Sequence, residues 1–207
     1  MTDTNEQNKV IPTGYPELDK LLDGGLRKDG CLITCTSNFG LATRFTLKIA
    51  GKFLRNVNYD KSVLYFLMGN SIFREDEIYS CLHIDSTKFN RFEIIDWQPN
   101  DCEMINVIKK YKCLSNLGLV IVDDIDHCKI SGKSDKRSDF DTFLSMVTLK
   151  EITNKLNIPV LAVKQPMNPE SFRSVSMFTN VILDIDYRKI SATKITNTEF
   201  ILKDDDI

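Results

Sequence analysis

The sequence lacks several features that would place it in a specialised class of protein. No apolar run approaches the roughly 20 residues of a membrane-spanning helix. The first ten residues, MTDTNEQNKV, are polar and contain no apolar signal-peptide core. Only 9 glycines and 6 prolines occur among 207 residues, which excludes collagen-like and low-complexity chains. We therefore expect an intracellular protein with no membrane partner, cytoplasmic or, in a eukaryote, nuclear.

A strong charge of one sign and a metal-binding cysteine pattern are also missing. The net charge is −2, so the overall field does not attract nucleic acid, and DNA contacts would need a local patch. The spacings of the six cysteines match no zinc motif. They are Cys31, Cys35, Cys81, Cys102, Cys113 and Cys128. We expect buried or free thiols in a reducing compartment, and no metal site through these residues.

What the sequence does contain is an alternation of apolar strands and amphipathic helices. We expect strands over 31–36, 61–69, 92–97, 117–126, 158–165, 179–188 and 189–202. We expect helices over 15–23, 41–57, 74–83, 101–114 and 140–156, the first capped by Thr13 and ended by Gly24 and Gly25. Nearly continuous apolar strands indicate an α/β fold, with a mostly parallel twisted sheet, helices on both faces and an antiparallel C-terminal edge. One domain should cover 10–203, between a disordered segment at 1–9 and an acidic tail at 204–207.

The stretch LITCTSNFGLATRF, residues 32–45, lies where a phosphate-binding loop would lie, between a strand and a helix. Such a loop has the pattern G-x-x-x-x-G-K-[ST], whose lysine reaches the phosphates and whose hydroxyl holds Mg²⁺. Gly40 matches the second glycine, but Cys35, Leu41 and Ala42 replace the first glycine, the lysine and the hydroxyl residue. Thr43 comes one residue late, so we expect its hydroxyl to point elsewhere around the helix. By itself the stretch also fits an ordinary strand–helix turn.

Five further stretches, in order along nearly the whole chain, carry a resemblance to a known family. They are IPTGYPELDKLLDGGLRKDGCLIT, SVLYFLMGN, LGLVIVDDI, LKEITNKLNIPVLAVKQ and FTNVILDIDYRK. Together they resemble the RecA-like ATPase core, and most closely the C-terminal motor domain of DnaB-type replicative helicases. The resemblance implies a P-loop NTPase fold. It places a degenerate phosphate loop at Asn38, Phe39, Gly40, Leu41, Ala42 and Thr43.

The resemblance also implies which catalytic groups are lost. The family's catalytic glutamate matches Gly69, beside Asn70, and its late lysine–arginine region is TKITN, which keeps Lys194 without the arginine. Remnants of the site are the Walker B aspartate Asp123 with Asp124, and the strand-end sensor Gln165. Losing a single transition-state donor costs about 10²–10³ in rate. Because phosphoryl transfer depends on such groups, we expect no enzyme activity.

Three smaller features each have a functional and a plain interpretation. Asp123, Asp124 and Asp126 could bind Mg²⁺ or Ca²⁺, or could be acids exposed at the strand tip. Phe39 could anchor a partner or fold into the vacated nucleotide space. The basic loop carries Lys129, Lys133, Lys136 and Arg137. It matches a family loop that contacts single-stranded DNA, but it contains no aromatic residue for stacking and also fits a solvated loop.

The first hypothesis is a catalytically inactive RecA/DnaB-like protein of DNA replication or recombination. It would act by binding a partner protein, such as a replicative helicase or recombinase subunit, as a regulator or assembly factor. The second is a nucleotide-binding sensor without hydrolysis, which leaves weak ATP and Mg²⁺ binding open although no cofactor is expected. The third is a single-stranded DNA-binding recombination accessory of the recombinase-paralogue type.

Overall fold

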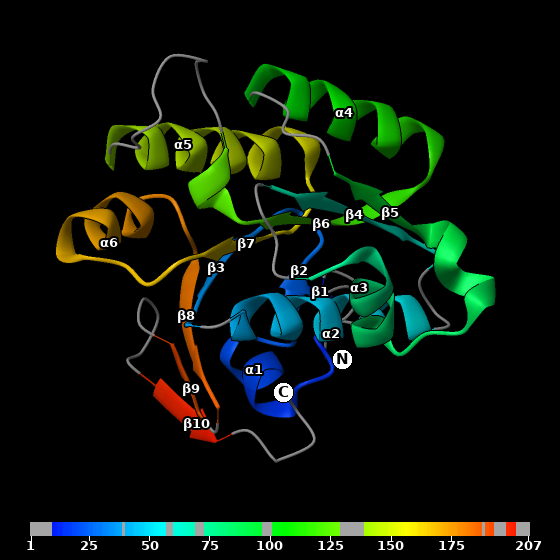
Figure 1. Ribbon diagram of the computed structural model, residues 1–207, viewed down its shortest axis with the longest axis horizontal. Coiled ribbons are helices and arrows are strands. Elements are labelled where there is room, and N and C mark those ends of the chain that lie inside the picture. The colour runs from blue at the N-terminus through cyan, green and yellow to red at the C-terminus, as the bar shows by residue number, and fades with distance from the viewer. Residues whose placement is uncertain are drawn as a thin grey trace, which may run out of the picture.

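A computed structural model describes residues 10–38, 40–56, 60–68, 73–96, 101–128, 139–187, 189–192 and 198–201 (Figure 1). Several sequence predictions concern residues outside these ranges. They are the N-terminal segment 1–9, the acidic tail 204–207, Phe39, Gly69, Asn70, Lys129, Lys133, Lys136, Arg137 and Lys194. These predictions therefore remain predictions.

The fold is built on an eight-stranded sheet with the order β10-β9-β8-β3-β7-β6-β4-β5. Its parallel strands are β3 (Leu32–Thr36), β4 (Ser62–Leu67), β5 (Phe92–Ile95), β6 (Leu117–Asp123), β7 (Val160–Lys164) and β8 (Val181–Asp186). Two antiparallel strands, β9 (Lys189–Ala192) and β10 (Thr198–Ile201), extend the edge beyond β8. The predicted α/β class, with a mostly parallel sheet and an antiparallel C-terminal edge, is confirmed.

Helices cover both faces of this sheet (Figure 1). One face carries α1 (Pro16–Leu21), α2 (Leu41–Arg55) and α3 (Glu75–Leu82), and the other carries α4 (Asp101–Leu114), α5 (Asp139–Leu156) and α6 (Pro169–Ser176). Short 3₁₀ turns, η1 (Ser86–Arg91) and η2 (Ile125–His127), follow α3 and β6. The sequence did not predict α6, η1 or a small antiparallel pair, β1 (Val10–Ile11) with β2 (Leu26–Arg27). The strand predicted over 117–126 ends at Asp123, and η2 follows it. Among the described helices, none is both long and apolar enough to cross a membrane.

Each strand divides its side chains between two apolar cores because successive residues point to opposite faces. Ile33 and Cys35 of β3 belong to the core under α2, together with Phe45 and Phe53 of that helix. Leu32 belongs to the core under α5. The buried helix face that the sequence predicts for α2 is confirmed. The same alternation decides, at the end of each strand, which face receives a polar side chain.

The entry segment before β2 is held by a side-chain network rather than by a simple helix cap. The Thr13 hydroxyl and the Thr13 N–H both donate to Asp19 Oδ1, each at 2.6 Å, and the Tyr15 N–H donates to Thr13 Oγ1 at 3.2 Å. Tyr15 is the N-cap residue and makes no side-chain cap. The prediction that Thr13 caps the helix is therefore wrong. Pro16 starts the helix without an N–H, and the threonine hydroxyl instead joins the chain before α1 to its first turn.

Candidate functional site

The loop between β3 and α2 uses its own groups to satisfy the amides at the start of the helix. The Ala42 N–H donates to Ser37 Oγ at 2.7 Å, and the Leu41 N–H reaches the Asn38 carbonyl at 3.4 Å. Gly40 allows the tight turn because its φ of +73° lies in the left-handed region. In a phosphate loop such amides face the phosphates. Here they are already bonded within the chain.

The two positions that the resemblance matches to the lysine and the hydroxyl residue of a phosphate loop point into the protein. Leu41 and Ala42 are both buried and belong to the apolar core under α2. Neither offers a polar atom to a ligand. Arg44, the next cationic side chain along the helix, lies over the Phe73 ring with its guanidinium carbon 5.3 Å from the ring centroid. The observed contact of Arg44 is therefore with an aromatic ring.

Asp123, at the end of β6, faces the α2 side and is only 5% exposed. Burial raises its pKa to about 6, while hydrogen bonds from Tyr65 and Thr43 act in the opposite direction. The Tyr65 hydroxyl donates to Asp123 Oδ2, and burial also raises the tyrosine's own pKa well above its usual value. The expectation that the Thr43 hydroxyl points elsewhere is wrong. Thr43 lies in the first turn of α2, and this turn faces β6.

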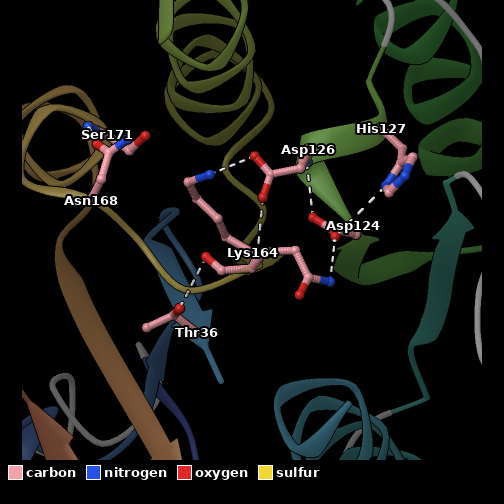
Figure 2. Close-up of polar contacts among 8 residues, drawn as sticks. Thr36, Asp124, Asp126, His127, Lys164, Asn168 and Ser171 are labelled. Carbon is pink, nitrogen blue, oxygen red and sulfur yellow. Dashed lines mark hydrogen bonds and ion pairs between the residues drawn. The ribbon is translucent and has the colours of Figure 1, made fainter. Parts of the chain in front are cut away.

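Four side chains from β6, η2 and β7 form a second cluster on the other side of the strand ends (Figure 2). Lys164 Nζ forms an ion pair with Asp126 Oδ1. The Gln165 side-chain amide donates to Asp124 Oδ2 at 2.9 Å, and its backbone N–H donates to Asp126 Oδ2 at 3.1 Å. The Asp126 N–H closes the turn by donating to Asp124 Oδ1 at 2.8 Å. The cluster therefore ties the end of β6 to the end of β7.

Two neighbours extend this cluster. The Thr36 hydroxyl, at the end of β3, donates to the Gln165 carbonyl at 3.2 Å, and His127 Nδ1 lies 3.7 Å from Asp124 Oδ2. Asp124 is 7% exposed, and burial together with the nearby Asp126 charge raises its pKa. The interpretation of Asp123 and Asp124 as acids exposed at the strand tip is wrong. The β4 tyrosine and the β7 strand end cover them.

The structure brings together some predicted residues and adds others that the sequence reading missed. Asp123, Asp124 and Gln165 do meet at one edge of the sheet, as the ends of parallel strands should. Tyr65, Lys164 and Ser37 were not predicted. Lys164 left a signal, since it is a charged residue that ends an apolar strand. Tyr65 left none, because its contact depends on the pairing of β4 with β6.

The residues present do not fit a bound Mg²⁺–nucleotide. The amides of Leu41 and Ala42 are bonded internally, the side chains of these two residues are apolar, and Asp126 already holds an ammonium group. Within the part of the chain that the structure describes, no three His, Cys, Asp or Glu side chains converge as a metal-ligand set. No step of nucleotide chemistry can be derived from this arrangement.

A comparison of the sequence with protein-family models and with curated proteins finds no match. The class that the fold defines is accordingly an α/β protein with a mostly parallel sheet, and its candidate site lies at the carboxyl ends of β3, β6 and β7.

Proposed function

We propose that this chain is a catalytically inactive RecA-like protein that acts in DNA replication or recombination by binding a partner protein. The partner class is a replicative helicase or recombinase subunit. Support for the class comes from the ordered stretches that resemble the RecA-like core and from a parallel sheet whose strand ends gather the matching residues. Ligands of such sheets bind beyond the carboxyl ends of the strands.

The bond from the Ala42 N–H to Ser37 Oγ carries the proposal of inactivity. A nucleotide would have to displace this internal acceptor before a phosphate oxygen could reach the amide. It would then gain no lysine contact, because Leu41 is buried in the core. A phosphate loop works through both groups together, so this loop has neither of its two main sources of affinity.

Local charge supports the same conclusion. A triphosphate at this edge would approach Asp124 and Asp126, and Lys164 is already paired with Asp126. Like charges brought within a few ångströms repel each other strongly at a partly buried site. Partner binding needs none of these groups and depends only on the outer surface of the fold. A pseudo-enzyme that keeps an α/β fold without the lysine and hydroxyl of a phosphate loop is therefore the function best supported.

The first test is a titration of fluorescent ATP into the protein, with and without Mg²⁺, beside a variant that restores the motif, Leu41→Lys with Ala42→Thr. Each charge-assisted hydrogen bond contributes about 1.5–3 kcal/mol, so the wild type should show no saturable binding at millimolar nucleotide. The restored variant should bind more tightly than the wild type. Micromolar, Mg²⁺-dependent binding by the wild type would contradict the proposal and favour a nucleotide sensor.

The second test concerns the partner. The purified chain is mixed separately with the replicative helicase and with the recombinase of its source organism, and each mixture is studied by sedimentation velocity. We expect one mixture to yield a faster-sedimenting complex that persists without nucleotide. If neither protein forms a complex, the proposed partner class is wrong, whatever the nucleotide titration shows.

A further inference from the structure

The ion pair between Lys164 and Asp126 is unusual in how deeply the lysine lies. The side chain of Lys164 is 5% exposed and that of Asp126 is 18% exposed. The preceding alternate residues of β7, Val160 and Ala162, belong to the core under α5, so Lys164 follows them to that face. Lysine is rarely buried to this extent unless its charge is compensated. Its ammonium group is therefore held at the carboxyl end of β7, on the face of the sheet that α5 covers.

Asp126, in η2 after β6, binds the end of β7 through both of its carboxylate oxygens. One carboxylate oxygen accepts from the ammonium, and the other accepts from the backbone N–H of Gln165. Gln165 in turn donates to Asp124 and accepts from Thr36. The ends of β3, β7 and β6 are thus linked side by side by side-chain and backbone groups (Figure 2).

We infer that Lys164 is a built-in counterion that locks this edge of the sheet in one ligand-independent conformation. Two neighbouring carboxylates on a strand-end turn ordinarily require a cation or protons to lie so close together. The lysine supplies the cation covalently, and it acts as a positioning residue through Asp126. This inference deepens the proposed function and rests on it, since a binding protein without nucleotide needs a surface that stays fixed without nucleotide.

An ordinary buried ion pair and a built-in counterion make different predictions. Loss of either would destabilise the fold. If Lys164 is a counterion, removing its ammonium group leaves Asp124 and Asp126 as a carboxylate pair with uncompensated charge. This pair should then attract another cation. Gain of cation binding is therefore the measurement that separates the two roles.

The experiment measures Mn²⁺ affinity by isothermal titration at fixed ionic strength for the wild type, Lys164→Ala and Lys164→Arg. A matched control is Lys155→Ala, which removes a lysine from an exposed pair with Glu151. We expect Lys164→Ala to bind Mn²⁺ on the order of tenfold more tightly than the wild type, because one nearby positive charge is gone. Lys164→Arg and Lys155→Ala should match the wild type. A folded Lys164→Ala variant with wild-type Mn²⁺ affinity would overturn the inference.

Should Lys164→Ala fail to fold, the double variant Lys164→Ala with Asp126→Asn removes both charges and keeps the inference testable. The measurement is hydrogen exchange at the Gln165 amide in the free protein. We expect this amide to be protected in the wild type with or without millimolar Mg²⁺, and to exchange on the order of tenfold faster in the double variant. Equal protection in both proteins would refute the lock. Because no partner or nucleotide is present, this result does not depend on the tests of the proposed function.

Discussion

Two aspartates at the end of the same strand meet their surroundings in opposite ways. Asp123 turns towards α2 and receives a hydrogen bond from the neutral hydroxyl of Tyr65, while its pKa is raised by burial. Asp126 lies three residues further on and is paired with the ammonium group of Lys164. Burial favours the uncharged form of Asp123, whereas the charge of Asp126 is compensated by an ammonium group. In both places a side chain of the protein itself contacts the carboxyl group.

The largest loss of stability is expected from breaking the ion pair between Lys164 and Asp126. Lys164→Met keeps an unbranched apolar chain in place of the lysine stem and leaves Asp126 without its cation, which should lower the free energy of unfolding by about 3–5 kcal/mol. Urea denaturation at pH 7 measures the change. Lys155→Met, which removes the exposed partner of Glu151, is the matched control and should have little effect. Equal losses in the two variants would mean that the burial of Lys164 has no energetic consequence.

The contribution of Asp123 to stability should depend on pH. The pKa of Asp123 is raised from 3.8 to about 6, so the folded protein binds more protons than the unfolded chain between these values. The favourable contribution of the protonated form is therefore complete below pH ~4 and is lost as the pH rises through ~6. Asp123→Asn removes this dependence. Its stability relative to the wild type should increase by about 2–3 kcal/mol between pH 4 and pH 7, measured by urea denaturation.

The direction of the change in stability with pH can contradict this prediction. A wild-type protein that gains stability over the same pH interval, relative to Asp123→Asn, would show that the carboxylate is the favoured form in the fold. Asp123 would then resemble Asp126 rather than contrast with it.

A smaller loss is expected when the hydroxyl beside Asp123 is removed. Tyr65→Phe leaves the buried carboxyl group without one of its donors and should cost about 1–3 kcal/mol. The control is Tyr111→Phe, whose hydroxyl donates to Glu93 at 2.8 Å in an exposed position. Thermal unfolding of the two variants side by side measures the difference. A Tyr111 variant that loses as much stability as the Tyr65 variant would argue against a special role for the buried pair.

The smallest effect concerns the loop. Ser37→Ala removes the acceptor of the Ala42 N–H and should lower stability by ~1 kcal/mol, as for the loss of a helix N-cap. Ser176→Ala is a suitable control because the Ser176 hydroxyl donates to the Arg173 carbonyl at an exposed site. Guanidinium denaturation resolves a change of this size. Restored nucleotide binding in Ser37→Ala would show that the internal bond alone blocks the loop.

The main elements of the fold could be predicted because their apolar periodicity is strong. The strands around Leu32 and Val160 are almost entirely apolar, and α2 places Phe45, Ile49 and Phe53 on one buried face. Helix α6 was missed because its eight residues contain only two buried ones, Ser171 and Val175. Its start did carry a local signal, since Asn168 precedes Pro169 and its side chain accepts from the Ser171 N–H at 2.7 Å.

The candidate site could be predicted only in outline. That Asp123 and Gln165 lie at one edge follows from parallel strands, but the partner of each does not. Tyr65 reaches Asp123 because the register of β4 and β6 pairs Leu67 with Asp123, which puts the tyrosine on the same face. That register depends on tertiary packing. The direction of the Thr43 hydroxyl was predicted incorrectly for a similar reason. The spacing of an ideal phosphate-loop motif predicted it, but the conformation of the turn before α2 determines it.

The central position of β3 also determines when this strand can pair with its neighbours during synthesis. This apolar strand, Leu32–Thr36, pairs on one side with β7, which begins at Val160, and on the other with β8, which begins at Val181. At about 5–20 residues per second, both partners are synthesised on the order of ten seconds after β3. During that interval the strand, which is fully buried in the folded protein, has neither of its two partner strands. β3 can therefore complete its pairing only after the second half of the chain has been translated.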